Sequence, residues 1–337
     1  MNLILQLYLG IIILIRCKAL KNMKFLYEGC DYVVKTINAI LKNHITLFGN
    51  SPKVEKINVG FTNTIYKIND SFIVKICTNI NNESKFKKEI EFYKKNQENS
   101  LIPKLYYSSS DKRDIPYLYE IIEKVDGVSL YNVWHTFKEE QREDVIKQLC
   151  NAMKCIHSNT SEKYDWTKII ESEFLLLYEK AKKLNIFNKK EQKNLECAYD
   201  KFEEYLQSND FVLIHNDLHF DNIIFNDGKI KLIDFERSMY APRDFELTII
   251  YRMIRKPWKF ASEDTEQYTN LSHYLNIMSY IEKYYPKLVS ISNLYKRLAI
   301  YDIVYFLKHL VQNPNIEELK NDVLLATKKV LEKDEID

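Results

Sequence analysis

Residues 211–236 read FVLIHNDLHFDNIIFNDGKIKLIDFE, and this stretch decides how the rest of the chain is interpreted. Apolar runs typical of buried strands flank two short polar islands. Asp217 and Asn222 lie in the first island, and Asp234 follows the predicted strand 229–233. Kinases place in this order a carboxylate that orients the attacking hydroxyl and two oxygen ligands for magnesium. The stretch therefore predicts phosphoryl transfer from ATP.

Each of these residues also has an ordinary structural interpretation, because Asp and Asn often cap turns or end strands. At this joint spacing the chemical interpretation is favoured. Asp217 would accept a hydrogen bond from the acceptor hydroxyl and hold it in line with the γ-phosphate. Asn222 and Asp234 would bind Mg²⁺, which prefers hard oxygen ligands. His215 is expected to brace the loop by hydrogen bonding, and His219 has no assigned task.

The composition is that of a soluble globular protein, with 46% hydrophobic and 28% charged residues in 337. A net charge of +2 provides no large field for attracting nucleic acid or an anionic membrane, so neither partner is expected. The six cysteines are scattered without a C-x-x-C pair, which predicts neither a zinc site nor a disulfide framework. Inert thiols fit a reducing, cytoplasmic compartment.

Residues 1–22 form a separate apolar extension. The nearly unbroken apolar run Leu3–Ile15 is short for a membrane span, which needs about 20 residues. A signal peptide carries its positive charge before the apolar run, whereas here the basic residues follow it. A start of translation at Met23, or a loosely docked extra helix, is favoured over a membrane anchor.

The remaining chain has a β-rich front and a helical rear. The predicted strands 54–59, 64–68 and 72–76 are separated by short turns and form an antiparallel meander. The other predicted elements are a helix over 30–47, a helix over 83–96, strands over 105–108 and 117–123, and helical segments over 138–157, 170–207, 244–256, 264–284 and 292–332.

This order predicts an α+β, bilobal architecture. An N-terminal nucleotide-binding lobe, residues 23–123, would contain a small antiparallel sheet and one main helix. A larger, mostly helical C-terminal lobe, residues 124–337, would carry the catalytic loop and bind the acceptor.

Lys75 is the single cation on the apolar strand FIVKI. On a solvent-facing edge it would be unremarkable. The helix that follows contains Glu89, and in kinases such an ion pair holds the α- and β-phosphates of ATP. Glu83 and Glu91 compete for the role of partner, and helical phase does not choose between them.

The turn that contains Gly60 and Asn63 would cover the phosphates. It has a single glycine and matches neither G-x-G-x-x-G nor G-x-x-x-x-G-K-[ST]. Backbone amides of a tight turn can still meet phosphate oxygens. This is the weakest element of the predicted nucleotide site.

With these residues in place, the chain resembles the aminoglycoside phosphotransferase and choline kinase family, a small-molecule branch of the protein-kinase-like fold. HNDLHFDN at 215–222 resembles the family's H-G-D-L-H-x-x-N catalytic loop, with Asn216 in place of the common Gly. IDFE at 233–236 resembles the segment that stands where protein kinases have D-F-G. YAPRDFEL at 240–247 resembles a family segment ending in Y/F-D-L, and Glu246 takes the position of a usually aspartic structural residue, which leaves its bracing role open.

The resemblance covers about residues 53–260 and implies a function for several positions. Lys75 would be the ATP-phosphate lysine and Glu89 its helix partner. Glu123 and Val125 would belong to the hinge whose backbone meets adenine. The implied cofactors are ATP, or another nucleoside triphosphate, and Mg²⁺. The implied acceptor is a hydroxyl of a small molecule such as an aminoglycoside, choline or ethanolamine.

The residues around the predicted site bear weakly on the acceptor. A site for a polycationic acceptor should be rich in carboxylates. Between Lys231 and Lys259, seven basic residues outnumber four acidic ones, which weakly disfavours a highly cationic acceptor. Solvated surface charge would also explain most of them. Tyr240, Tyr251 and Trp258 could form an aromatic box for a quaternary ammonium group, although packing is the simpler role for them.

Two other classes of function compete with a small-molecule kinase. A catalytically silent nucleotide-binding protein of this kind typically lacks one of Lys75, Asp217, Asn222 and Asp234, and all four are present. A protein kinase would need an activation segment that binds a peptide. The chain has no A-P-E motif, and the stretch 234–246 is too short for such a platform. The sequence is silent on the oligomeric state.

Overall fold

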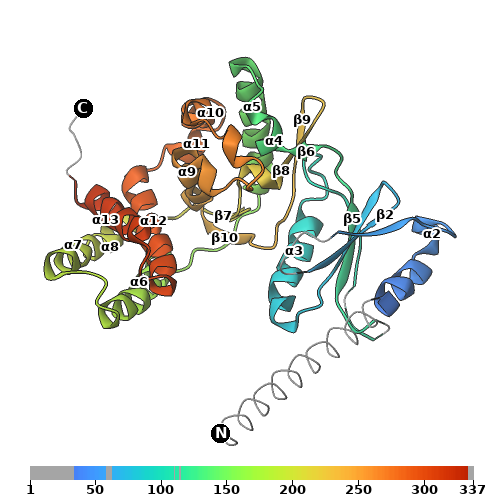
Figure 1. The fold of residues 1–337 in the computed structure, drawn as a ribbon, viewed down its shortest axis with the longest axis horizontal. Coiled ribbons are helices and arrows are strands. Elements are labelled where there is room, and N and C mark those ends of the chain that lie inside the picture. The colour runs from blue at the N-terminus through green and yellow to red at the C-terminus, as the bar shows by residue number, and fades with distance from the viewer. Residues whose placement is uncertain (1–33, 58–62, 110, 114, 333–337) are drawn as a thin grey trace, which may run out of the picture. The chain divides into compact units, whose positions relative to one another are not determined.

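The computed structural model describes residues 34–57, 63–109, 111–113 and 115–332 (Figure 1). The predicted extension 1–22, the start of the predicted first helix, and Gly60 lie outside these residues. The chain forms two compact units. The first contains the described residues up to Phe86 together with Leu105–Lys124, and the second contains Lys87–Lys104 and the described residues from Val125 onward. The predicted lobes 23–123 and 124–337 differ from these units in residues 87–104 and at Lys124, and as functional domains they remain predictions.

The first unit is built on a five-stranded antiparallel sheet with the strand order β1-β2-β3-β5-β4. The strands are β1 (Val54–Ile57), β2 (Thr64–Ile68), β3 (Phe72–Ile76), β4 (Leu105–Ser108) and β5 (Tyr119–Glu123). The predicted meander is confirmed, because β2 pairs with both of its neighbours in sequence. β5 begins two residues later than the predicted strand 117–123.

One face of this sheet is covered by the helical residues 34–43 and by α2 (Ile45–Phe48). The core cluster on that face contains Ile37, Ile40, Phe48, Tyr66, Ile68, Val74, Ile76, Ile115, Tyr119 and Ile121. Successive side chains of a strand point to opposite faces of the sheet. Lys75 and Glu120 each lie between two residues of this cluster, so both point to the opposite face.

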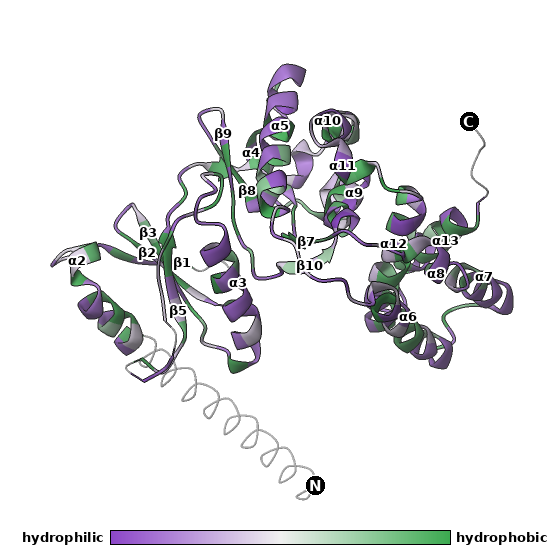
Figure 2. Cartoon of the chain, turned by 180° about the vertical axis from the view of Figure 1, so that it is seen from behind, coloured by the Kyte–Doolittle hydropathy of each residue, from purple (hydrophilic) through white to green (hydrophobic). Residues whose placement is uncertain are grey.

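The second unit is mostly helical, and in Figure 2 helices such as α6 and α13 carry both hydrophilic and hydrophobic stretches. The helix α3 (Glu83–Lys95) begins in the first unit and continues into the second. The other helices are α4 (Leu130–Trp134), α5 (Glu139–Ile156), α6 (Trp166–Lys183), α7 (Lys189–Tyr199), α8 (Phe202–Leu206), α9 (Leu247–Arg255), α10 (Ile277–Tyr284), α11 (Pro286–Val289), α12 (Leu294–Gln312) and α13 (Glu317–Leu331). In the described parts of the chain, no helix has the length and apolar character that a membrane crossing requires.

Two small sheets position the polar islands of the second unit. β7 (Phe211–Ile214) pairs antiparallel with β10 (Met239–Pro242). β6 (Val128–Ser129), β8 (Ile223–Asn226) and β9 (Lys229–Leu232) form a three-stranded sheet in the order β6-β8-β9. β7 is buried along its whole length, as its unbroken apolar sequence predicts.

Three of the predicted helical segments are interrupted. In the predicted segment 264–284 only α10 is α-helical, and it follows 3₁₀ turns at Glu266–Tyr268 and Leu271–Tyr274. The predicted segment 170–207 is divided because Asn185 adopts a left-handed φ of 53° and Asn188 then caps α7 with Glu191 in a capping box. The predicted segment 292–332 is divided into α12 and α13 around Pro314, which lacks the N–H that a continuous helix needs.

Gly127 connects the start of the second unit to the catalytic segment. Its φ is 127°, and a Cβ at this position would lie 2.3 Å from the carbonyl oxygen of Phe225 on β8. Ser129 follows in β6, caps α4 by accepting from the Tyr131 amide, and donates to Asp221 Oδ1 at 2.6 Å. The Asp-Gly-x-Ser segment thus holds β6 and α4 against the loop that carries Asp217.

Candidate active site

The island HNDLHFDN forms the connection from β7 to β8, and its short 3₁₀ turn Phe220–Asn222 leads directly into β8. Asn222 Nδ2 donates to the main-chain oxygen of Asp217 at 2.8 Å. The main-chain oxygen of Asn222 accepts from the Ile233 amide at 3.0 Å. Because Asp234 follows Ile233, the structure brings together the three predicted residues Asp217, Asn222 and Asp234.

The Asp217 carboxylate is accessible to an acceptor. Its side chain is 18% exposed, and its Oδ2 lies 3.5 Å from Nε of the half-exposed Arg237. This is a loose ion pair at the surface, worth little to stability. An accessible carboxylate on a braced loop can accept a hydrogen bond from an incoming hydroxyl.

His219, which had no assigned task, orients the side chain of Asn222. Its Nε2 lies 3.2 Å from Asn222 Nδ2 and accepts from it. Burial is the main cause that lowers the pKa of His219, which favours the neutral ring that this acceptor role requires. Both hydrogen bonds of the Asn222 side chain to described residues use Nδ2, so Oδ1 is left for a cation.

The oxygen donors of Asn222 and Asp234 are of the kind that Mg²⁺ prefers. Such an ion takes only one or two protein ligands in addition to phosphate and water oxygens. Asn222 Oδ1 and the Asp234 carboxylate would supply that number. Among the described residues, no group of three or more His, Cys, Asp or Glu side chains could hold a metal ion, and this site does not need one.

Asp234 is held by its neighbour Phe235. Phe235 is fully buried, and its ring stacks on Phe92 of α3 with a centroid distance of 4.0 Å. It also packs against Tyr93 at 5.4 Å and against the His215 ring at 4.7 Å. His215 Nε2 donates to the Ile233 carbonyl at 3.0 Å. His215 therefore links the two polar islands by a hydrogen bond and by ring packing.

Glu246, whose role the sequence left open, braces the start of the catalytic loop. Its carboxylate is buried and accepts from the main-chain amides of His215 at 2.8 Å and Asn216 at 3.0 Å. His157 Nε2 lies 3.2 Å from Glu246 Oε2. Burial raises the pKa of Glu246, but the hydrogen bond to His157, nearby positive charge and the His215 amide lower it more, so the net shift is downward.

Asn216 occupies the position where a glycine is common in the family, and its backbone conformation explains why asparagine is suitable there. Its φ is 62°, in the left-handed region that Asn tolerates better than most residues. Its side-chain Nδ2 donates to the Arg237 main-chain oxygen at 3.1 Å. The side chain thus adds a contact to the second polar island that a glycine cannot make.

In the first unit, the neighbour of Lys75 is a residue that sequence reasoning missed. Lys75 is buried on β3, and Glu120, buried on β5, lies directly opposite it in the strand register. Residues opposite each other in an antiparallel pair place their side chains on the same face. The sequence does contain an indication of Glu120, because in the strand YEIIE an acidic residue interrupts an apolar run.

The remaining predicted nucleotide residues are placed as follows. Glu89 is fully buried on α3, and its pairing with Lys75 stays a prediction. Asn63 directly precedes β2, and Gly60 lies outside the described residues. Glu123 ends β5 and Val125 begins the long C-terminal segment of the second unit. Their contacts with a nucleotide stay predictions.

A family model described as "Phosphotransferase enzyme family" matches residues 53–275 of this sequence. The chain belongs to the phosphotransferase enzyme family. The predicted family resemblance is thereby confirmed. No curated protein sequence matches the chain significantly.

Solved structures place this phosphotransferase among kinase-like folds. The ADP-bound aminoglycoside phosphotransferase APH(2'')-Ib has a TM-score of 0.59 at 16% identity, over 86% of this chain and 96% of that one. The GDP complex of aminoglycoside 2'-phosphotransferase-IIIa has a TM-score of 0.56 at 13% identity, over 88% and 98%. Amicoumacin kinase hAmiN, in complex with AMP-PNP, Ca²⁺ and Ami, has a TM-score of 0.52 at 16% identity, over 87% and 92%. The predicted α+β, protein-kinase-like fold is confirmed.

Cations of the protein lie over two of the aromatic residues considered for a quaternary ammonium box in this phosphotransferase. Lys95 Nζ lies 5.1 Å from the centroid of the Tyr240 ring. The Arg255 guanidinium lies 4.2 Å from the centroid of the Tyr251 ring. In the described part of the chain no ring contact joins any two of Tyr240, Tyr251 and Trp258. Two of the three rings are thus already faced by cations of the protein itself.

Proposed function

We propose that this phosphotransferase is a small-molecule kinase, which transfers the γ-phosphate of ATP, or of another nucleoside triphosphate, to a hydroxyl group with Mg²⁺. The observation that carries the proposal is the loop from His215 to Asn222. There an accessible Asp217 carboxylate lies beside an Asn222 side chain whose oxygen is left for a cation, and buried Glu246 holds the loop.

In this proposal each residue has one task. Asp217 accepts a hydrogen bond from the acceptor hydroxyl and aligns its oxygen with the γ-phosphorus. Asn222 and Asp234 hold Mg²⁺, which when bound neutralises charge on the β- and γ-phosphate oxygens. His219 and Phe235 position these two ligands.

The residues that the family resemblance assigns to the nucleotide donor complete the proposal. Lys75 binds the α- and β-phosphates, with Glu89 as its partner. The turn containing Gly60 and Asn63 covers the phosphates with backbone amides. The main chain of Glu123 and Val125 meets the adenine ring. Neighbouring structures in complex with ADP, GDP and AMP-PNP support a nucleotide as the donor.

The segment after Asp234 argues against a protein kinase. Met239 to Pro242 form β10 and pair with β7, so only residues 235–238 separate Asp234 from the next strand. A segment this short offers no platform for a peptide. Solved neighbours in complex with gentamicin and streptomycin support a small-molecule acceptor instead. Choline and ethanolamine remain candidates by family resemblance, and a cytoplasmic location is part of the proposal.

Replacing Asp217 tests the proposal. We expect Asp217→Asn to lower kcat for ATP-dependent phosphorylation by about 10²–10⁴, the usual contribution of a positioned acid–base group. ATP binding, measured by calorimetry, should stay within about twofold, because Asp217 has no proposed contact with the nucleotide. The matched control is Asp227→Asn in the exposed turn between β8 and β9, which should leave kcat unchanged. Near-normal turnover of Asp217→Asn would remove Asp217 from its proposed role.

A further inference from the structure

A cavity of about 470 Å³ lies among α9, α12, α13 and the short turn Pro257–Lys259. Its volume suits a small organic ligand. One of its wall residues, Phe260, lies beside the catalytic loop. The ring of Phe260 lies 6.4 Å from the ring of His219. Burial, and then the positive charges of Lys308, Arg252 and Arg237, lower the pKa of the wall residue His309.

The charged side chains of this cavity are unequal in number. Three carboxylates line it, and five cationic side chains face them: Arg252, Arg255, Lys256, Lys259 and Lys329. A polycationic ligand would need carboxylates that the protein has not already neutralised.

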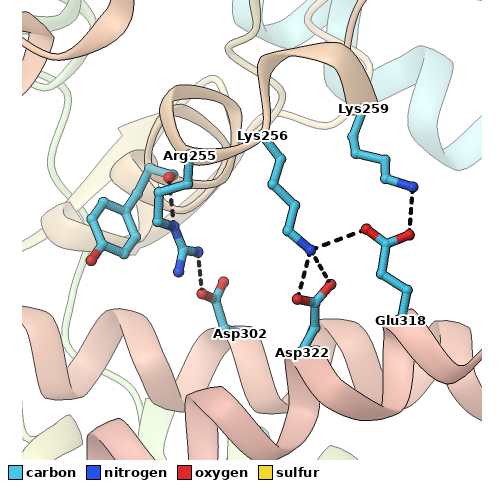
Figure 3. A network of polar contacts seen from close by, with 7 residues as sticks. Arg255, Lys256, Lys259, Asp302, Glu318 and Asp322 are labelled. Carbon is cyan, nitrogen blue, oxygen red and sulfur yellow. Dashed lines mark hydrogen bonds and ion pairs between the residues drawn. The ribbon is translucent and has the colours of Figure 1, made fainter. Parts of the chain in front are cut away.

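Every one of the three carboxylates is bound to a cation of the protein (Figure 3). Asp302 accepts from Arg252 at 2.6 Å and from Arg255 at 2.5 Å. Lys256 donates to both oxygens of Asp322, at 2.7 and 2.8 Å. Glu318 accepts from Lys259 at 2.7 Å and from Lys256 at 3.2 Å.

Lys329 is the wall cation that lacks such a partner. No carboxylate of the described residues lies within ion-pair distance of its ammonium group, and its side chain is half-buried. Burial, followed by the positive charge of Arg255, lowers the pKa of Lys329, and the more weakly acting carboxylates of Asp302 and Glu332 offset this only in part. A ligand anion beside Lys329 and Arg255 would remove this penalty on the charged form.

We propose that this cavity binds the acceptor, and that the acceptor carries a carboxylate or phosphate group in addition to the hydroxyl that receives the phosphate. The inference rests on the kinase function proposed above and narrows its acceptor. Lys329 and Arg255 bind the anionic group, and the hydroxyl points toward Asp217. The hydroxyl oxygen forms a bond to the γ-phosphorus, the bond from that phosphorus to the bridging oxygen breaks, and the nucleoside diphosphate leaves with the electron pair. The hydroxyl proton passes by way of Asp217 to solvent.

Binding titrations on the full chain test this inference. Gluconate, glycerol 3-phosphate, glucose and kanamycin are each titrated into the protein by calorimetry, with and without a non-hydrolysable ATP analogue and Mg²⁺. We expect at least one of the two anions to bind at least about tenfold more tightly than glucose or kanamycin, because a charge-assisted hydrogen bond contributes about that factor. Comparing gluconate with glycerol 3-phosphate separates carboxylate recognition from phosphate recognition.

Variants of Lys329 supply the second measurement. Lys329→Met should weaken anion binding about ten- to a hundredfold, and Lys329→Arg should retain it, because the arginine keeps the charge. The control Lys328→Met changes the neighbouring, largely exposed residue, whose side chain does not line the cavity, and should have no effect. An unchanged affinity for the ATP analogue verifies that each variant is folded.

Three results would overturn the inference: kanamycin binding as tightly as the anions, no binding of either anion, or unchanged anion affinity in Lys329→Met. The titrations without nucleotide test anion binding to the cavity independently of ATP binding. Failure of the ATP analogue to bind would instead count against the proposed kinase function.

Discussion

Asn216 combines two requirements at one residue. The loop needs a left-handed backbone conformation, with φ at 62°, directly before Asp217. Most L-residues are disfavoured there by about 1–2 kcal/mol, whereas Gly and Asn tolerate it. The Asn216 side chain also donates to the Arg237 main chain at 3.1 Å. An asparagine therefore adopts the left-handed conformation that a glycine would allow, and it adds a hydrogen bond between the two polar islands.

We predict that Asn216→Gly folds and keeps phosphate transfer within about tenfold, because it preserves the backbone and loses one hydrogen bond. Asn216→Val should destabilise the protein by about 1–3 kcal/mol, since a β-branched residue is strained at this φ and also loses that bond. Urea unfolding measures both changes. The control is Asn226→Val at the exposed end of β8, where the extended backbone suits valine. Equal stability of Asn216→Val and the native chain would contradict the strain argument.

At the scale of the element, the sheet of the first unit places two opposite charges side by side. Lys75 and Glu120 are buried register partners on β3 and β5, on the face opposite the core cluster. A buried ammonium group is tolerated when a carboxylate compensates it. We infer that Glu120 positions the ammonium group of Lys75 within the sheet.

A double-mutant cycle tests the pairing of these two strands. We predict that Lys75→Met and Glu120→Gln are coupled by about 1–3 kcal/mol in urea unfolding, as contacting buried residues are. The matched control is Lys67 with Glu55, which are also register partners and form a 2.9 Å ion pair, but Glu55 is exposed and Lys67 is only partly buried. Solvent screens that pair, so its coupling should be smaller. Strictly additive effects at Lys75 and Glu120 would show that Glu120 does not support the lysine.

At the scale of the whole molecule, the sequence predicted those features that depend on neighbouring residues along the chain, such as the bounds of strands and the residues that share a loop. The strands at 64–68, 72–76 and 105–108 have the predicted bounds, because alternating or unbroken apolar runs end there at turn residues. The spacing of Asp217 and Asn222 predicted their proximity, because a single loop contains both. Long-range contacts were the part that the sequence could not supply.

His219, Glu120 and Glu246 illustrate this limit. Each is a polar residue whose task its own segment does not specify. The role of each depends on a partner that the sequence does not point out: Asn222 for His219, Lys75 across the sheet for Glu120, and the amides of residues 215–216 for Glu246. Only the fold identifies these partners.

The same long-range contacts predict how the stability of the molecule depends on pH. Glu246 and Asp210 have lowered pKa values in the folded protein, Glu246 through the balance described above, and Asp210 chiefly through its hydrogen bonds to Arg243. Their ordinary values are 4.5 and 3.8. When the folded pKa lies below the unfolded one, the unfolded chain binds more protons in acid. The stabilisation is thus fully present above these ordinary values and is lost as the pH falls below them.

We therefore predict a steep fall of the unfolding temperature below about pH 4.5, which a calorimetric series from pH 7 to pH 3 would measure. Glu246→Gln should lower stability at neutral pH by about 1–3 kcal/mol, because one buried amide donor would then face an amide nitrogen. The same variant should make the acid slope shallower, because position 246 no longer titrates. A control, Glu98→Gln, removes a carboxylate at an exposed site that is paired with no described residue, and should leave the slope unchanged. An acid slope of Glu246→Gln equal to that of the native chain would mean that other carboxylates govern the acid transition, and that Glu246 contributes to the loop through geometry alone.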